Sequence, residues 1–267
     1  MIRPPAVAGR FYSSDPRELA RDVDQFVISA SEKISALGCV VPHAGYMYSG
    51  HVAGAVYSSL EIPRRCILLG PRHFPRGESM AILTEGSWQT PFGEAQIDSA
   101  LARELAYACP RLREDAVAHE CEHSLEVQLP FLQRLAPDFR FVPVVLGTER
   151  YPVLEELGHA VAHVVAAQAE RVLVIASSDM NHYENDAITR VKDERAIARI
   201  LALDPRGLYD TVRTEGISMC GYAATVAMLV AVLDRGATEA RLIRYATSGD
   251  VSGDYDRVVG YAGIAIE

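Results

Sequence analysis

Three apolar stretches of this sequence end in turn residues and then deliver a histidine within a few positions. They are CVVPH (39–43), CILLGPRH (66–73) and VLVIASSDMNH (172–182). Each stretch has the short, β-rich, apolar composition of a buried strand. Because ligands in open α/β sheets bind beyond the carboxyl ends of the strands, we expect His43, His73 and His182 to meet at one pocket. The similar run FVPVVLG at 141–147 ends without a histidine, so a histidine is not a general property of these strand ends.

Metal binding is the chemistry that such histidines favour. Imidazole is the commonest metal ligand, and a catalytic metal site takes about three protein ligands and one open position. His43 and His73 are the predicted pair of ligands. Cys220 is the third candidate, because it precedes Gly221 and an apolar helix whose N-terminus is expected to lower the thiol pKa. A thiolate there binds metal or acts as a nucleophile, and the alternative is a small buried apolar residue.

Asp179 and His182, in SSDMNHY, form a candidate acid–base pair. A carboxylate near a histidine can fix the tautomer of the ring and raise its basicity. The spacing of the two residues is common, so it does not by itself specify an activity.

Residues 119–123 read HECEH and match the HExxH motif of zinc metalloproteases. In that motif two histidines one helical turn apart bind zinc, and the glutamate activates water. So short a match arises readily by chance, and the surrounding residues are charged, so zinc hydrolysis is a minor alternative. The remaining histidines, His51, His159 and His163, fall within predicted helices away from strand ends, as surface or core residues.

Strand and helix patterns alternate along the whole chain. Strands are predicted at 38–41, 66–69, 80–84, 94–97, 141–146, 171–176, 241–246 and 257–266. Helices are predicted after a cap at Asp15 and at 49–60, 99–108, 154–165, 188–203 and 222–233, and 119–135 is helical in pattern but interrupted by Pro130. This alternation predicts a single α/β domain over residues 1–267, a sandwich around a central, mixed, largely parallel sheet.

Composition excludes several classes of function. Of the 267 residues, 49% are apolar and 23% charged, as in ordinary soluble globular proteins. The net charge of −9 argues against a nucleic-acid binder. No signal segment and no apolar run of about 18 residues is found, so we expect a cytoplasmic protein with no membrane partner. Five cysteines without a CxxC pair make a disulfide framework unexpected.

Several longer motifs carry a family resemblance. In chain order they are RPPAVAGRFY (3–12), PHAGYMYSG (42–50), LLGPRH (68–73), EHSLEVQLPFL (122–132), SSDMNHY (177–183), MCGYAA (219–224) and YATSGDVSGD (245–254). Together they resemble the MEMO family, whose bacterial and archaeal members are called AmmeMemoRadiSam system protein B. The resemblance covers the whole chain.

The resemblance implies a fold like that of the class III extradiol dioxygenases, with a metal pocket at the strand ends. In those enzymes two histidines and a glutamate hold Fe(II), and a further histidine is the acid–base residue. By position, His43 and His73 match the histidine ligands, Cys220 takes the place of the carboxylate, and His182 matches the acid–base residue. His123 belongs to the EHS motif and is expected to line the same pocket, whereas His119 lies outside that motif.

This sequence departs from the dioxygenase pattern at the third ligand and from some family members in the second motif. A cysteine makes the site softer, so copper and zinc compete with iron, and it argues against ring cleavage. Phe74 follows His73, where some members carry two adjacent histidines. If the second of those were the family's ligand, His73 would be a neighbour of the metal rather than a ligand.

Two functions remain open from the sequence. The first is an iron-dependent, or copper-dependent, redox enzyme with His182, Asp179 and His123 as catalytic residues and an unknown substrate. The second is a non-catalytic protein that binds a peptide or small molecule, or that sequesters metal. Homo-oligomerisation is possible in either case.

Overall fold

Parallel strands form the centre of the sheet in the computed structural model, which describes residues 1–27 and 32–267. In spatial order they are β6 (Gly93–Ile97), β8 (Arg140–Leu146), β3 (Arg65–Pro71), β9 (Val172–Ser177) and β2 (Gly38–Val41). Neighbours within this run all pair in parallel. Every residue of β2 and β9 is buried, which explains their uninterrupted apolar sequences.

Strands that pair mostly antiparallel extend the sheet on both sides. Beside β2 lies β12 (Val258–Ile266), which also pairs with β11 (Ala240–Thr247) and β10 (His182–Glu184). At the other side β5 (Ser87–Thr90) pairs antiparallel with β6, and β1 (Ile2–Arg3) pairs parallel with β5. Strand β4 (Met80–Ile82) pairs antiparallel with β8 and parallel with β7 (Arg113–Glu114). The predicted α/β class with a mixed, mostly parallel sheet is thereby confirmed.

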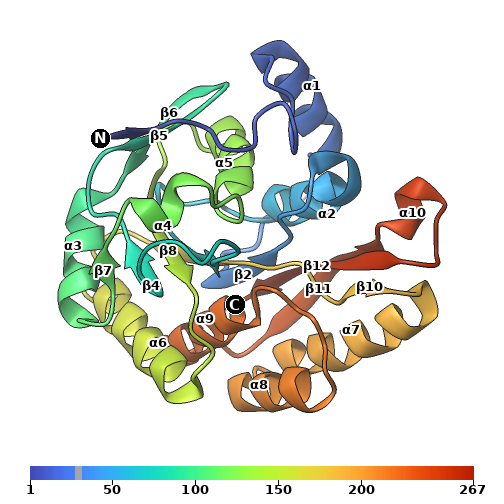
Figure 1. Ribbon diagram of the computed structural model, residues 1–267. Helices are drawn as coiled ribbons and strands as arrows, with labels where there is room; N and C mark the ends of the chain where they lie inside the picture. The colour runs from blue at the N-terminus through green and yellow to red at the C-terminus, as the bar shows by residue number, and fades with distance from the viewer. Residues whose placement is uncertain (28–31) are drawn as a thin grey trace.

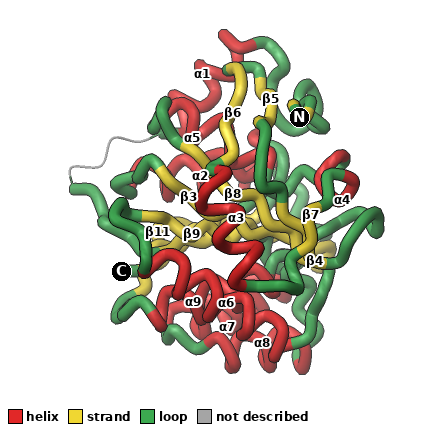
Figure 2. The backbone as a smooth tube through the Cα atoms, turned by 90° about the vertical axis from the view of Figure 1, so that its left-hand side faces the viewer, coloured by secondary structure: helices red, strands yellow, loops and turns green. Residues whose placement is uncertain are grey.

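Helices cover both faces of the sheet (Figures 1 and 2). One face carries α6 (Tyr151–Ala166), α7 (Asp186–Leu201), α8 (Pro205–Thr214) and α9 (Tyr222–Asp234), with α3 (Ser99–Ala108) beside α6. The other face carries α2 (Tyr46–Ser59) and α5 (Leu129–Leu135), on which α1 (Pro16–Phe26) packs. Short turns of helix are α4 (Val117–Glu120), the 3₁₀ helix η1 (Glu126–Gln128) and α10 (Gly249–Ser252).

The order of the strands creates a crevice at their carboxyl ends. Helix α2 connects β2 to β3 over one face, whereas α6 connects β8 to β9 over the other, so that β9 lies between β3 and β2. The two connections run in opposite directions across the sheet, which is the arrangement that opens a ligand-binding crevice. Val41 of β2 pairs with Ser177 of β9, so these two strands end side by side.

Some elements differ from the sequence prediction. Residues 87–90, for which no strand was predicted, form strand β5 because their backbone pairs with both β1 and β6. Helix α2 begins at Tyr46 rather than 49, and α8 was not predicted. The region 119–135 is broken more severely than expected, because α4 ends at Glu120 and α5 restarts at Leu129 with Pro130 in its first turn.

In residues 1–27 and 32–267, no helix combines the length and apolar character needed to cross a bilayer. All five cysteines are free.

Candidate metal centre

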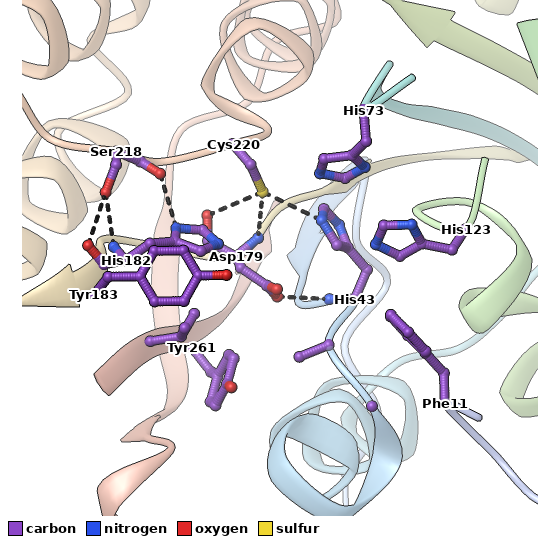
Figure 3. Close-up of a pocket in the computed structure, with 13 residues that line it drawn as sticks. Phe11, His43, His73, His123, Asp179, His182, Tyr183, Ser218, Cys220 and Tyr261 are labelled. Atoms are coloured by element: carbon purple, nitrogen blue, oxygen red, sulfur yellow. Dashed lines mark hydrogen bonds between the residues drawn. The ribbon is translucent and has the colours of Figure 1, made fainter. Parts of the chain in front are cut away.

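A cavity of about 590 Å³ opens at the carboxyl ends of β2, β3 and β9 (Figure 3). Its lining includes all six residues that the sequence nominated as site residues: His43, His73, His123, Asp179, His182 and Cys220. Phe11, Tyr183 and Tyr261 supply aromatic walls, and Ser218 lies beside His182. The three strand-end histidines therefore meet in one pocket, as the sequence predicted.

His43, His73 and Cys220 bring their ligand atoms within 4.8 Å of one another. His43 follows β2, His73 follows β3, and Cys220 immediately precedes the N-cap of α9. The Sγ atom of Cys220 lies 3.2 Å from Nε2 of His43, and the two imidazole rings are 5.2 Å apart between centroids. Distances of this size allow one ion to bind all three residues.

The tautomer of His43 follows from the hydrogen bonds of Ser177. The Ser177 hydroxyl donates its single proton to the backbone carbonyl of Ser124 at 2.6 Å, and it accepts from Nε2 of Gln128 at 2.8 Å. The hydroxyl oxygen lies 2.9 Å from Nδ1 of His43 and, with its proton already donated, can only accept a hydrogen bond from that nitrogen. Nδ1 must carry the proton, which leaves the lone pair on Nε2, facing Cys220.

His43 is also held in its neutral form. The side chain is 1% exposed, and burial, reinforced by the neighbouring His73, lowers the pKa of the imidazole well below its usual value. A neutral ring with a free Nε2 is the species that binds a metal ion.

His73 has the same arrangement with a carboxylate partner. Its Nδ1 lies 2.9 Å from Oε1 of Glu122, which is fully buried. Glu122 also accepts the backbone N–H groups of His73, His123 and Ser124. Burial opposes ionisation of this carboxyl group, but the hydrogen bonds from His73 and the backbone lower the pKa of Glu122 to about 2. The carboxylate thus fixes the proton on Nδ1 of His73 and leaves Nε2 free.

Glu122, Ser177 and Ser218 are partners of the candidate site residues that the sequence did not nominate. Glu122 stands next to His123 in the EHS motif, and Ser177 opens the SSD motif, so both lay within stretches already singled out. Neither partnership is visible in the sequence, because Glu122 is 49 positions from His73 and Ser177 is 134 positions from His43.

The expected low pKa of Cys220 is wrong for the metal-free protein. Burial, together with the nearby Asp179 carboxyl group, raises the pKa of this thiol well above its usual value. Cys220 precedes the N-cap Gly221 and so lies just outside α9, where the field of a helix falls off. Desolvation therefore exceeds the helix effect, although the backbone N–H of Asp179 does point at Sγ from 3.3 Å.

Asp179 and His182 both lie in the pocket with ligand atoms within 4.8 Å of each other, but no hydrogen bond joins the carboxylate to the ring. Nδ1 of His182 instead lies 2.8 Å from the carbonyl oxygen of Ser218. A carbonyl only accepts, so Nδ1 carries the proton here as well, and Nε2 is free. Asp179 accepts the backbone N–H of His43 at 2.7 Å, and burial raises the pKa of its carboxyl group.

His123 lies between two rings at the edge of the pocket. Its imidazole stacks on His73 at 4.5 Å and meets Phe11 at 4.7 Å between centroids. Burial, reinforced by His43, lowers the pKa of His123 to about 4, so the ring is neutral near pH 7.

The HExxH geometry of zinc metalloproteases is not formed. Helix α4 ends at Glu120, so His119 and His123 do not share a helical face. His119 is fully buried and packs against Trp88, with ring centroids 5.5 Å apart. In the described part of the chain, none of the groups of possible metal ligands includes His119. His51, His159 and His163 lie on α2 and α6, as expected.

The donor set fits a transition-metal ion. His43, His73 and Cys220 offer two imidazole nitrogens and one sulfur, a set that suits iron, copper or zinc. Among the residues that the structure describes, two other groups have ligand atoms within 4.8 Å of one another: His73 with Glu122 and His123, and Asp179 with His182 and Cys220. The carboxylate of Glu122 already accepts several N–H groups, which makes the first of these less available.

Comparison with solved structures supports the fold. An uncharacterized protein from Escherichia coli K12 superimposes with a TM-score of 0.56 at 13% identity, over 85% of this chain and 98% of that one. At this level of identity the likeness concerns the α/β fold alone.

Comparison at the level of sequence defines the family. A family model described as Memo-like protein matches residues 3–265. A MEMO1 family protein of Methanopyrus kandleri is 42% identical, over 99% of this chain and 98% of its own length. One from Methanothermobacter thermautotrophicus is 39% identical, over 98% of this chain and 99% of its own. The chain belongs to the MEMO family.

Proposed function

We propose that this protein is a redox enzyme that holds one metal ion between His43, His73 and Cys220. Iron is the first choice of metal, and copper or zinc is the alternative. The observation that carries the proposal is the convergence of two Nε2 atoms and one Sγ within 4.8 Å, with Nδ1 of each ring held by a buried partner. Such partners orient metal-binding histidines in known sites.

Bound iron would supply one-electron exchange at a position open to the cavity. His43, His73 and Cys220 would hold the ion at the lining of the 590 Å³ cavity, where a substrate or an oxidant could reach it. Cys220 adds a ligand that can itself be oxidised, which suits redox chemistry better than a carboxylate would.

His182 is the residue that would move protons. Its Nδ1–H is held by the Ser218 carbonyl, so that Nε2 is the atom that accepts and releases a proton. Asp179 would hold the backbone of His43 in place through the bond from its N–H group, and His123 would close the opposite side of the pocket.

Metal analysis of protein purified without oxygen tests the metal site. We expect about one equivalent of iron in the wild-type protein and a loss of most of it in His43→Ala, because a ligand is removed. His159→Ala is the matched control, since this exposed histidine on α6 lies outside the pocket, and it should retain the full equivalent. Equal metal content in both variants would place the metal elsewhere.

A non-catalytic role in binding a ligand or sequestering metal is the second candidate, favoured by the cysteine in place of a carboxylate. Iron-loaded protein can be oxidised with ferricyanide and reduced again with dithionite. A redox enzyme should keep its iron through this cycle with a reversible change in absorbance. Release of the iron on oxidation would favour the sequestering role.

The five free cysteines also fit a reducing compartment, and we infer a cytoplasmic location. Fractionation of the native cells would test that location.

A further inference from the structure

Tyr183 breaks the alternation of strand β10. His182 and Tyr183 are consecutive, yet both line the cavity. In a regular strand, successive side chains point to opposite faces. The pairing of β10 with β12 shifts register between His182 and Glu184, and Tyr183 has a φ of +63°. Tyr183 is therefore the extra residue of a β-bulge, and the bulge turns its ring to the pocket side.

This backbone conformation is unfavourable for tyrosine. A bulky residue in the left-handed region is a true outlier, whereas glycine would adopt it freely. Strain of this kind persists where the surrounding structure imposes it, and it is concentrated at binding and catalytic sites. Bulges beside such sites commonly redirect one side chain.

Packing of the ring does not account for the strain. Tyr183 is 66% exposed, so its ring gains little from burial. Its aromatic neighbour is His182, at 5.6 Å between centroids, and the guanidinium carbon of Arg257 lies 5.7 Å from the ring centroid. A side chain this exposed is well placed to contact a ligand.

The other aromatic walls show what kind of ligand fits. Phe11 lies on the His123 side of the pocket, while Tyr183 and Tyr261 lie on the His182 side (Figure 3). The free nitrogens and the thiol lie between these walls. The pocket thus combines donor atoms for a metal at its base with aromatic surfaces at its sides, and aromatic faces favour contact with flat rings.

We propose that Tyr183 is a specificity-determining residue, whose ring selects a ligand with a planar ring attached to a metal-binding group. This inference rests on the metal site proposed above. The strained bulge is retained because it places the ring over the space beside the metal position.

Two hydroxamates separate the contact with the ring from the contact with the metal. Benzohydroxamate and acetohydroxamate carry the same chelating group, and only the first carries a ring. Zinc-loaded protein, which is inert to redox chemistry, would be titrated with both by calorimetry. We expect Tyr183→Gly to weaken benzohydroxamate about tenfold and to leave acetohydroxamate unchanged. Tyr183→Phe, which keeps the ring, should retain the wild-type affinity for both.

Leu203→Gly is the matched control for the backbone. Leu203 also has a positive φ, of +53°, but it lies between α7 and α8 and lines no part of the pocket. Its substitution should change neither affinity. Tyr183→Gly should also melt no more than about two degrees below the wild type, because the relief of strain offsets the flexibility of glycine.

Several results would overturn the inference. One is an equal effect of Tyr183→Gly on the affinities for both hydroxamates. Another is wild-type binding of benzohydroxamate that is no tighter than that of acetohydroxamate. A third is a large drop in the melting temperature of Tyr183→Gly, which would make Tyr183 a structural residue. The metal content of each sample is measured in parallel. If zinc does not bind, the proposed metal site fails, and the same pair of probes is titrated into metal-free protein, where the preference for the ring should still depend on Tyr183.

Discussion

At the scale of the residue, one arrangement occurs three times in the pocket. His43, His73 and His182 each direct Nδ1 toward a fixed oxygen, which belongs to Ser177, Glu122 and Ser218 respectively: a hydroxyl, a carboxylate and a carbonyl. Each oxygen acts as an acceptor, so each ring carries its proton on Nδ1. All three Nε2 atoms are left free for a metal, a proton or a ligand.

The role of Ser177 can be tested by removing its hydroxyl group. We expect Ser177→Ala to lower the affinity for metal by about 10- to 100-fold, because Nδ1 of His43 loses the acceptor that fixes its tautomer. Competition with a fluorescent zinc chelator measures this affinity.

Ser58→Ala is the matched control for Ser177→Ala. Ser58 is 2% exposed and bonds to the Gly54 carbonyl within α2, away from the pocket. The control should lose stability but keep the wild-type affinity for metal. The tautomer argument fails if Ser177→Ala binds zinc as tightly as this control.

At the scale of the element, the position of Cys220 depends on the close approach of α9 to β9. A Cβ atom on Gly221 would lie 2.5 Å from Cβ of Ser178 and still closer to the carbonyl oxygen of Ser177. Glycine at this N-cap lets the helix begin against the strand end, and Cys220 is thereby brought to His43.

Gly221→Ala should therefore displace Cys220. We expect a destabilisation of about 1–3 kcal/mol from overpacking, together with a loss of metal affinity. Gly158→Ala creates a similar clash, 2.5 Å from Cβ of Val230 between α6 and α9, but far along the chain from any ligand. Urea unfolding and metal titration should show that both variants are destabilised and that Gly221→Ala alone binds metal poorly. Equal metal affinity in the two would contradict this role of Gly221.

Elements with strong internal patterns were predictable from the sequence, and elements defined by their neighbours were not. Strand β2 and helix α3 were predicted with the bounds observed, because the apolar pattern that marks each of them lies within its own residues. Strand β5 depends on pairing with β1 and β6, which no local pattern reveals. The bulge at Tyr183 likewise arises from pairing with β12.

The residues that line the candidate site were predictable from the sequence, but the residues that hydrogen-bond to them were not. Histidines at strand ends can be recognised because the sheet brings those ends together. The pKa of Cys220 could not be predicted, because it depends on burial by segments distant in the sequence.

At the scale of the whole molecule, distant segments are joined by buried charges. Arg3, which is 5% exposed, pairs with the buried Glu126 at 2.6 Å, and Glu126 also accepts from the hydroxyl of Tyr12. The N-terminal segment, rich in proline and glycine, is thus fixed against η1, and Phe11 is held at the pocket. Its sequence gave no sign of this anchorage.

Asp193 should make the stability of the whole protein depend on pH. Burial raises the pKa of this carboxyl group from 3.8 to about 7, against smaller opposing effects of the Asn181 N–H, the Tyr245 hydroxyl and Arg190. Between these two values the unfolded chain has released the proton and the folded protein retains it. The free energy of unfolding therefore falls as the pH rises through this window, by at most about 4 kcal/mol from this group.

Asp193→Asn should remove that part of the pH dependence, because the amide does not titrate. Urea unfolding of both proteins from pH 4 to 8 would measure the difference. Asp24→Asn, which alters an exposed carboxylate paired with Arg134, should leave the decline in place. Parallel curves for Asp193→Asn and the wild type would show that Asp193 does not retain its proton in the folded state.

The absorption spectrum of the cobalt-substituted protein tests the central claim, that His43, His73 and Cys220 hold one metal ion together. A thiolate bound to Co²⁺ gives an intense charge-transfer band in the near ultraviolet. We expect this band to grow until one equivalent of cobalt has been added, to disappear in Cys220→Ser, and to be lost or strongly weakened in His43→Ala and His73→Ala. A full band in either histidine variant, or no thiolate band in the wild type, would contradict the claim.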